Sequence, residues 1–230
     1  MKNLMYLLIA GAGLMMTSCA KEDSSDVNQD KIYCDYEVFY NANEDKTHAV
    51  ARFWFGGPTG TLLELSDSSG ANVTFNGDVL PYNALYSGHH KEYAGKLTGG
   101  TFVYTNTDGT VFTNSTPSGA DTLAFPADFD TINKSVAQTL AWNGSALGPD
   151  EQVSIFVGSW TWGQDASFYT SDDGATEVVM GVTQMANLAL GTSTVYMDRY
   201  TGVDVTEGTS KGGRIRYKYR CPNATVQVVE

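Results

Sequence analysis

Alternating hydrophobic and polar positions recur along the chain in short stretches from residue 32 onward. Residues 32–40 alternate, which is the period of a strand with one buried face. Residues 49–55 are apolar except at Arg52, as in a strand buried on both faces. Further short strands are predicted at 62–65, 73–75, 101–105, 110–113, 122–125, 135–142, 152–157, 167–170, 176–182, 194–198, 214–220 and 225–229. This pattern predicts an all-β fold.

Turn residues separate these stretches. Asn76-Gly77, Asn143-Gly144 and Asp173-Gly174 are strong signals for tight turns. Asn106-Thr107-Asp108-Gly109 joins two predicted strands as a hairpin. Residues 185–190 are expected to form one helical turn, the connection that many sandwich domains make between their sheets.

A domain boundary is predicted where residues 114–120 become rich in Ser, Thr, Pro and Gly. Short strands on either side predict two tandem immunoglobulin-like antiparallel β-sandwich domains, over residues 32–116 and 117–230. The alternative is one larger sandwich whose first and last strands meet through Cys34 and Cys221.

Residues 1–18 precede the predicted fold and have a different pattern. A positive start at Lys2 is followed by an apolar run and then by small residues before Cys19, the order of a secretory signal peptide. The apolar run is too short to span a bilayer as a permanent helix. Residues 1–18 are therefore expected to be a signal peptide that is removed.

Met16-Thr17-Ser18-Cys19 resembles the lipobox of bacterial lipoproteins, with Met16 where that family usually has Leu. The resemblance implies that Cys19 receives the lipid and becomes the first mature residue. The acidic residues that follow resemble the tag that sends some outer-membrane lipoproteins to the outer face of the cell. Residues 19–31 are thus expected to be a lipidated cysteine and a flexible acidic tether, on the cell outer membrane and facing the exterior.

The acidic balance of the chain argues against one class of partner. The formal net charge is −12, and it becomes −13 without residues 1–18, which hold one Lys and no acid. Phosphate binding needs a basic surface, so nucleic acid is not an expected partner. No second apolar run reaches membrane-spanning length, so the lipid on Cys19 is the expected contact with the membrane.

Cys34 and Cys221 remain once Cys19 is assigned to a lipid. A pair of cysteines in an exported protein favours a disulfide over two free thiols. Each lies on the apolar side of an alternating strand, so the predicted bond ties the first ordered strand to the last. Closing so long a loop would remove about 5 kcal/mol of unfolded-state entropy in an unstrained native geometry.

Signals for catalysis, metals and cofactors are weak. The chain has no Gly-x-Ser-x-Gly motif. His89-His90-Lys91-Glu92 lacks the i, i+4 spacing of a zinc motif and is assigned to a polar loop. Asn106-Thr107-Asp108-Gly109 and Asp172-Asp173-Gly174 lack the closing Glu of a calcium loop and are better explained as hairpin turns. We therefore expect no enzyme activity, no metal and no cofactor.

A pair of indoles is the first candidate binding site. Trp160 and Trp162 lie on one side of an extended segment, followed by Gln164 and Asp165. Exposed indoles beside amide and carboxylate groups can bind sugar rings, whose faces are apolar and whose edges need polar partners. The alternative is a bulge at Gly158 that returns both Trp side chains to the core.

A basic stripe is the second candidate site. Arg214, Arg216, Lys218 and Arg220 alternate with apolar residues on a single strand. Charge on a solvent-exposed face or an edge strand commonly blocks pairing between sheet edges. The alternative is docking of an anionic surface, either a partner protein or an acidic glycan.

The predicted anchor and sandwich layout resemble the surface lipoproteins of Gram-negative bacteria that capture glycans or help assemble surface structures. The resemblance implies a lipid-anchored, non-enzymatic binding or adhesion module whose partner is a glycan or another surface protein. The first alternative is a fimbrial or pilus-like subunit, in which a strand is donated between protomers. The second alternative is a surface hydrolase.

Overall fold

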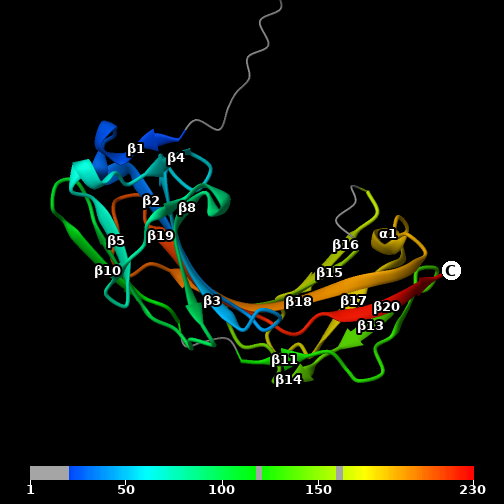
Figure 1. Cartoon of the computed structure of the whole chain (residues 1–230). Coiled ribbons are helices and arrows are strands. Elements are labelled where there is room, and N and C mark those ends of the chain that lie inside the picture. Colours follow the sequence, from blue (N-terminus) through cyan, green and yellow to red (C-terminus); the bar gives the residue numbers. More distant parts are fainter. Residues whose placement is uncertain (1–20, 118–120, 159–162) are drawn as a thin grey trace, which may run out of the picture.

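The structure is a computed structural model that describes residues 21–117, 121–158 and 163–230. It is nearly all β, which confirms the predicted fold class (Figure 1). The main sheet contains the strands β1 (Glu22–Asp23), β2 (Ile32–Asn41), β3 (Lys46–Phe55), β4 (Thr61–Glu64), β7 (Tyr82–Asn83), β8 (Gly88–Ala94), β12 (Thr131–Asn133), β15 (Glu151–Val157), β16 (Ala166–Thr170), β18 (Gly191–Asp204), β19 (Gly213–Arg220) and β20 (Ala224–Val229).

Three smaller sheets pack against the main sheet. One contains β5 (Asn72–Phe75), β6 (Asp78–Val79), β9 (Thr101–Thr105) and β10 (Val111–Ser115). The other two pair β11 (Leu123–Ala124) with β14 (Asn143–Gly144), and β13 (Gln138–Ala141) with β17 (Glu177–Met180). The helical elements are α1 (Val182–Met185) and the short 3₁₀ turns η1 (Ser24–Asp26), η2 (Gln29–Lys31), η3 (Asp67–Ser69) and η4 (Ala84–Tyr86). None of the helices in the described ranges is long and apolar enough to cross a membrane.

The main sheet runs through both halves of the chain. Its path is β1-β4-β3-β2-β19-β18-β15-β16, and β8 lies beside β4 on the same edge of β3. The 14-residue strand β18 pairs with β15 on one side and with β19 and then β20 on the other. Buried side chains from this sheet and the smaller sheets form one continuous hydrophobic core.

The predicted division into two tandem sandwiches is not confirmed. β2 and β3 precede the predicted boundary at residues 116/117, and β18 and β19 follow it, yet all four are neighbours in one sheet. The pairing is also not purely antiparallel, because β1–β4, β2–β19 and β12–β20 are parallel. Parallel partners far apart in sequence are joined by long connections, which local sequence patterns do not specify.

Two local predictions differ from the structure. The segment that contains His89 and His90 is strand β8, not a polar loop, because its backbone pairs with β3. Its side chains are polar on both faces, so no alternation marks it as a strand. The helical turn α1 begins at Val182 instead of residue 185, and it is Met185 that reaches the core.

The flexible tether predicted for residues 19–31 is wrong for the part that the structure describes. Residues 21–31 are folded: β1 adds a strand to the edge of β4, and η1 and η2 follow. The Gln29 amide donates to the carbonyls of Ser24, at 2.6 Å, and Val27, at 2.9 Å. The polar residues that suggested disorder instead cap short helical turns, as Asp23 does by accepting from the Ser25 amide.

The predicted disulfide is also wrong. Cys34 and Cys221 are both free and buried. Cys34 lies opposite Gly213 at the start of β19, whereas Cys221 follows Arg220 at its end. Because β2 and β19 run parallel, this offset places the two cysteines about 26 Å apart along the strand, where a disulfide needs Cα atoms within about 7 Å. Burial raises the pKa of both thiols to about 12, so neither is a reactive thiolate.

Candidate functional site

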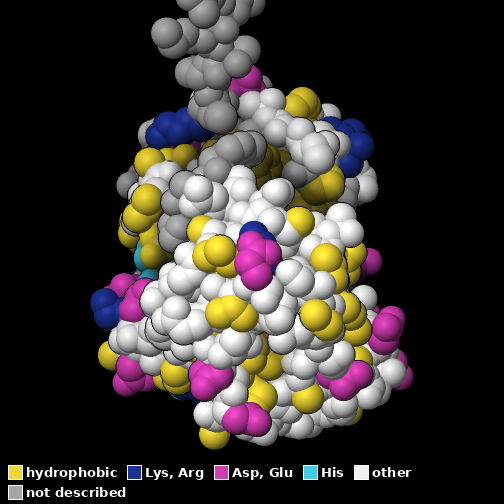
Figure 2. Space-filling model, turned by 90° about the vertical axis from the view of Figure 1, so that its right-hand side faces the viewer, with side chains coloured by type: hydrophobic (Ala, Val, Ile, Leu, Met, Phe, Trp, Pro, Cys, Tyr) yellow, Lys and Arg dark blue, Asp and Glu magenta, His cyan; other side chains and the backbone are white. Residues whose placement is uncertain are grey.

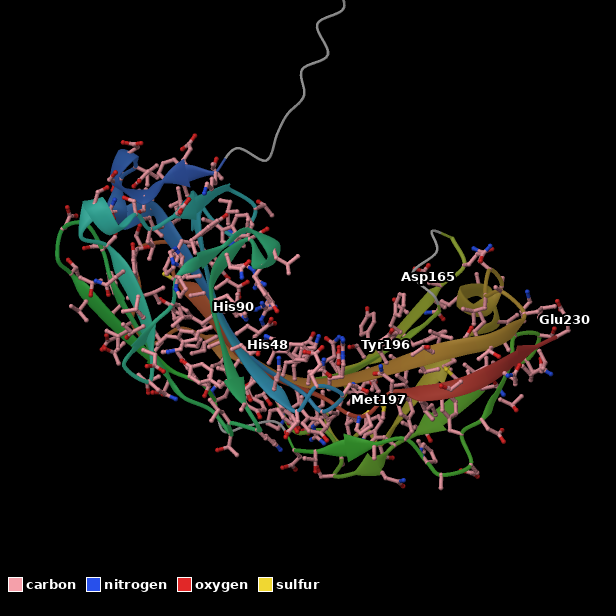
Figure 3. The ribbon with its side chains drawn as sticks, in the orientation of Figure 1. His48, His90, Asp165, Tyr196, Met197 and Glu230 are labelled. Atoms are coloured by element: carbon pink, nitrogen blue, oxygen red, sulfur yellow. The ribbon has the colours of Figure 1, made fainter. Side chains whose placement is uncertain are left out.

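The main sheet is curved, and the face turned away from the core is concave (Figure 1). Figure 3 places His48, His90 and Tyr196 on this concave face and Met197, the next residue along β18, on the opposite side. Met197 is fully buried in the core, whereas Tyr196 is half-buried. The concave face therefore carries the residues that alternate with the core positions.

Six ring side chains form a row across the concave face, and we call them the aromatic row. They come from η4, β8, β3, β2, β18 and β15, in the order Tyr86, His90, His48, Phe39, Tyr196 and Phe156. The ring centroids lie 3.7 Å apart for Tyr86–His90, 5.3 Å for His90–His48, 5.9 Å for His48–Phe39 and 6.0 Å for Tyr196–Phe156. The strands run at right angles to this row, so each strand contributes one ring.

Sheet register sets these contacts. Phe39 is directly opposite His48 on the neighbouring strand, and Tyr196 is directly opposite Phe156. Side chains that face each other across neighbouring strands lie close enough to pack. Strand β19 separates Phe39 from Tyr196, and there the Arg220 guanidinium lies 5.3 Å from both ring centroids. The cation thus continues the row between the two rings.

Two histidines meet in the row. His48 Nδ1 lies 3.0 Å from His90 Nε2 and 3.3 Å from the Tyr86 hydroxyl, while His48 Nε2 lies 3.6 Å from a carboxylate oxygen of Glu44. Burial, followed by the neighbouring His48, lowers the pKa of His90 below the ordinary histidine value. His90 is therefore neutral at pH 7, and this end of the row offers neutral donors and acceptors.

The basic stripe lies on the same face. Arg216 donates to both carboxylate oxygens of Asp35 at 3.0 Å, and Lys218 and Arg220 both contact Asp198. Because β19 lies between β2 and β18, it is a central strand, and the prediction that the stripe protects a sheet edge is wrong. The four positions do share one face, as the alternation predicted.

The surroundings shift the pKa values of the two carboxylates in opposite directions. Burial alone raises the pKa of Asp198, but the hydrogen bond from Arg220 and the charges of Lys218 and Arg220 outweigh it, so the net shift is downward. For Asp35 burial prevails over the charge of Arg216, and its pKa is raised. Asp198 is consequently the firmly ionised carboxylate of the stripe.

Polar groups lie on the same face as the aromatic row, two to four residues farther along β15, β16 and β18. The Tyr200 hydroxyl donates to the side-chain carbonyl of Gln152. Tyr169 is opposite Ser154 on the edge strand β16 and is 70 % exposed. These groups can exchange hydrogen bonds with hydroxyls of a ligand that lies across the strands.

The Trp site predicted from the sequence is only partly described. Trp160 and Trp162 lie outside the described residues. Gln164 is exposed and Asp165 is half-buried, next to the pair formed by Val157 and Ala166. Asp165 therefore lies opposite Gly158, two positions beyond Phe156 in the direction of the chain, at the end of the molecule that Figure 3 shows near Tyr196.

The aromatic row was not predicted, although the sequence carries a signal for it. Phe39 occupies the polar phase of the alternating residues 32–40, and Phe156 occupies the polar phase between Ile155 and Val157. A single exposed apolar side chain is common, and only a contiguous patch indicates a binding surface. Phe39 and Phe156 therefore become informative only once sheet pairing brings them into one row.

The other cavities and side-chain clusters of the described residues give weaker evidence for a binding site than the concave face does. A cavity of about 390 Å³ lies between β4, β5 and β7, with His89 in its wall. Both ring nitrogens of His89 contact backbone, Nε2 the Leu65 amide at 3.1 Å and Nδ1 the Leu80 carbonyl at 3.0 Å, so this residue is structural. Within the described ranges no group of three or more His, Cys, Asp or Glu side chains could hold a metal ion.

Figure 2 shows the end of the molecule that is on the right in Figure 1. Acidic side chains are spread over the lower part of this end, Lys and Arg side chains lie at its upper left, upper right and left, and the hydrophobic side chains are scattered without forming one patch.

Comparison with known proteins does not assign a family. No model of a protein family matches the chain, and no curated protein sequence matches it. A structure of the Bacteroides ovatus mixed-linkage glucan utilization locus SGBP-B in complex with a mixed-linkage heptasaccharide matches with 14 % identity and a TM-score of 0.25, over 90 % of this chain and 45 % of the other. The two tandem V-type regions of VCBP3, a chitin-binding protein, match with 8 % identity and a TM-score of 0.21, over 82 % of this chain and 98 % of the other.

Both matched structures belong to glycan-binding proteins, as their descriptions state. The chain spans less than half the length of the first. TM-scores of this size do not establish a common arrangement of strands, so no property of either protein is transferred to this chain.

Proposed function

We propose that the protein is a lipid-anchored, non-enzymatic binding module of the cell surface and that its concave face binds glycan chains. The anchor is Cys19, and the location proposed is the outer membrane, facing the exterior. The observation that carries the proposal is the aromatic row, with cations and amides beside it on one sheet face.

The chemistry of the row suits a carbohydrate. A sugar ring has apolar C–H faces and a rim of hydroxyls, so it binds where ring side chains lie next to hydrogen-bonding groups. The row supplies the apolar surface. Arg220 supplies donors within the row, and Gln152 and Tyr200 lie on the same face, about 13 Å farther along β15 and β18.

The length of the row favours a polymer over a single sugar. From β8 to β15 the row crosses five strand-to-strand intervals, which is about 24 Å at the usual strand spacing. A face of this length accommodates several consecutive sugar rings. We infer that the ligand lies across the strands, along the row.

Substitution in the row tests the proposal. We expect Phe39→Ala and Tyr196→Ala each to weaken polysaccharide binding by roughly tenfold, equivalent to about 1.4 kcal/mol, because each removes one contact surface. The measurement is retardation of the purified protein in native gels that contain soluble polysaccharides.

Phe129→Ala is the matched control. Phe129 is a half-buried ring stacked on Phe125, with centroids 5.4 Å apart, and it is not part of the concave face. Its loss should leave retardation unchanged at a similar cost in thermal stability. If no polysaccharide retards the wild type, or if the control weakens binding as much as the row variants, the concave face is not a glycan site.

A further inference from the structure

Charge is distributed unevenly along the basic stripe. Arg216 contacts both Asp35, at 3.0 Å, and Glu37, at 3.6 Å, and Arg214 is opposite Asp204 in the sheet. Arg52 is opposite Asp35 on the neighbouring strand, so at this end of the stripe three cations face three carboxylates. The end is therefore neutral on balance.

The other end carries an excess of positive charge. Asp198 alone receives Lys218 Nζ at 2.7 Å and Arg220 Nε at 2.6 Å, so two cations share one carboxylate. The two cationic side chains are 25 % and 21 % exposed, against 9 % for Asp198. The three side chains together have a net charge of +1. The positive charge is carried by Lys218 and Arg220, which are more exposed to solvent than Asp198.

The positive end of the stripe coincides with the middle of the aromatic row. Lys218 Nζ lies 4.9 Å from the Phe39 centroid, and Arg220 lies between Phe39 and Tyr196. Glu44 lies farther along the row, beyond Phe39, where it is 3.6 Å from His48 Nε2. A ligand on the row would meet Lys218 and Arg220 at its centre.

We propose that the ligand of the concave face is an acidic polysaccharide, with a carboxylate or sulfate group held by Lys218 and Arg220. This inference rests on the function proposed above and names the class of glycan. Arginine and lysine make their strongest hydrogen bonds to such anionic oxygens. Because the protein has a net charge of −12, a local excess of positive charge favours binding of an anionic polymer at this place over binding to the acidic remainder of the surface.

Paired polymers that differ only in charge test the inference. The first pair is polygalacturonate and its fully methyl-esterified form, and the second is dextran sulfate and dextran. For at least one pair we expect the charged polymer to bind at least tenfold more tightly to the full-length protein and to lose affinity as NaCl is raised. The pair with the larger difference identifies the anionic group as a carboxylate or a sulfate.

Single substitutions test whether Lys218 is responsible for the preference for the charged polymer. Lys218→Gln should weaken binding of the preferred charged polymer by roughly threefold to tenfold and leave its neutral counterpart unchanged. The control is Lys134→Gln, because Lys134 is 18 % exposed and pairs with Glu230 away from the concave face. It should change neither polymer's binding.

The outcomes separate this inference from the proposed function. Equal binding of the charged and neutral members in both pairs would overturn the inference and leave glycan binding intact. So would equal weakening by Lys218→Gln and Lys134→Gln. A wild-type protein that binds none of the four polymers, nor any other polysaccharide, would overturn both.

Discussion

Among single residues, Arg199 has the most unusual position. It is the largest of the fully buried side chains in the described ranges, 1 % exposed, and lies on the core side of β18. Its Nε donates to Glu151 at 3.2 Å, and its Nη1 and Nη2 donate to the carbonyls of Ser145 and Ala146, both at 3.0 Å. Burial alone raises the pKa of Glu151, but Arg199 and the Gly148 amide outweigh it and lower the pKa. The pair fastens the loop before β15 to the sheet.

Breaking this pair should be costly. We expect Arg199→Met to lower the free energy of unfolding by about 3–5 kcal/mol, because it leaves a partly buried carboxylate without its cation. Urea denaturation measures the change, with Arg214→Gln as the exposed control, which should stay within about 0.5 kcal/mol of wild type. A loss below about 1 kcal/mol for Arg199→Met would mean that the loop is held by other contacts.

For single residues, the sequence predicted which face of a strand a side chain occupies better than it predicted what that side chain contacts. The alternation from Arg214 to Arg220 correctly placed four cations on one face. It did not reveal their carboxylate partners, because Asp35 and Glu37 lie about 180 residues earlier and meet the stripe only through sheet pairing. Phe39 was overlooked for a related reason: its row neighbours come from five other elements.

Among the elements, the segment of residues 21–31 depends most on a few contacts. β1 is two residues long and pairs with β4. The Gln29 side chain connects the two helical turns to each other and accepts a hydrogen bond from the Thr107 amide at 3.4 Å. Lys21 pairs with Glu64, and Asp30 accepts from the Ser210 amide, so Gln29 is the contact that joins these two ends of the segment.

Gln29→Ala should release the segment without unfolding the protein. Losing buried hydrogen bonds of about 1–2 kcal/mol should speed amide exchange of residues 21–26 by roughly tenfold. Hydrogen-exchange mass spectrometry provides the measurement, and the core strand β18 should keep its protection. Gln184→Ala, at an exposed position in α1, serves as the control. Unchanged exchange at residues 21–26 would show that β1 is held by β4 alone.

Most strands were predictable because hydrophobic and polar residues alternate along a strand that has one buried face. Strands such as β9 and β20 begin and end within a residue of the predicted bounds. β8 was missed because its side chains face solvent or other polar groups, and β1 because two residues carry no period. β18 extends well past its predicted end because Arg199, on its core side, interrupts the apolar pattern.

Across the whole molecule, one sheet unites the two halves of the chain. β2 pairs along eight residues with β19, and the long strand β18 joins that pairing to β15 and β20. No local sequence pattern predicts this shared sheet, because each half of the chain contains a full set of predicted strands. The predicted boundary falls between β10 and β11, which belong to two different small sheets.

The shared sheet predicts that both halves unfold together. Differential scanning calorimetry should show one transition, with calorimetric and van't Hoff enthalpies in a ratio of about 1. Residues 32–116 expressed alone should show no cooperative transition, because β2 would lose β19 and expose its edge. Two resolved transitions, or a folded fragment, would restore the tandem-domain interpretation.

The attachment of β1 to β4 has a consequence for where the protein can work. β1 lies at the rim of the concave face (Figure 1), and a single residue, Ala20, separates Lys21 from Cys19. If Cys19 carries the proposed lipid, the backbone from Cys19 to Lys21 spans about 7 Å at full extension. The rim would then rest against the headgroups of the bilayer, and the protein could capture only chains that lie flat along the cell surface or emerge beside it.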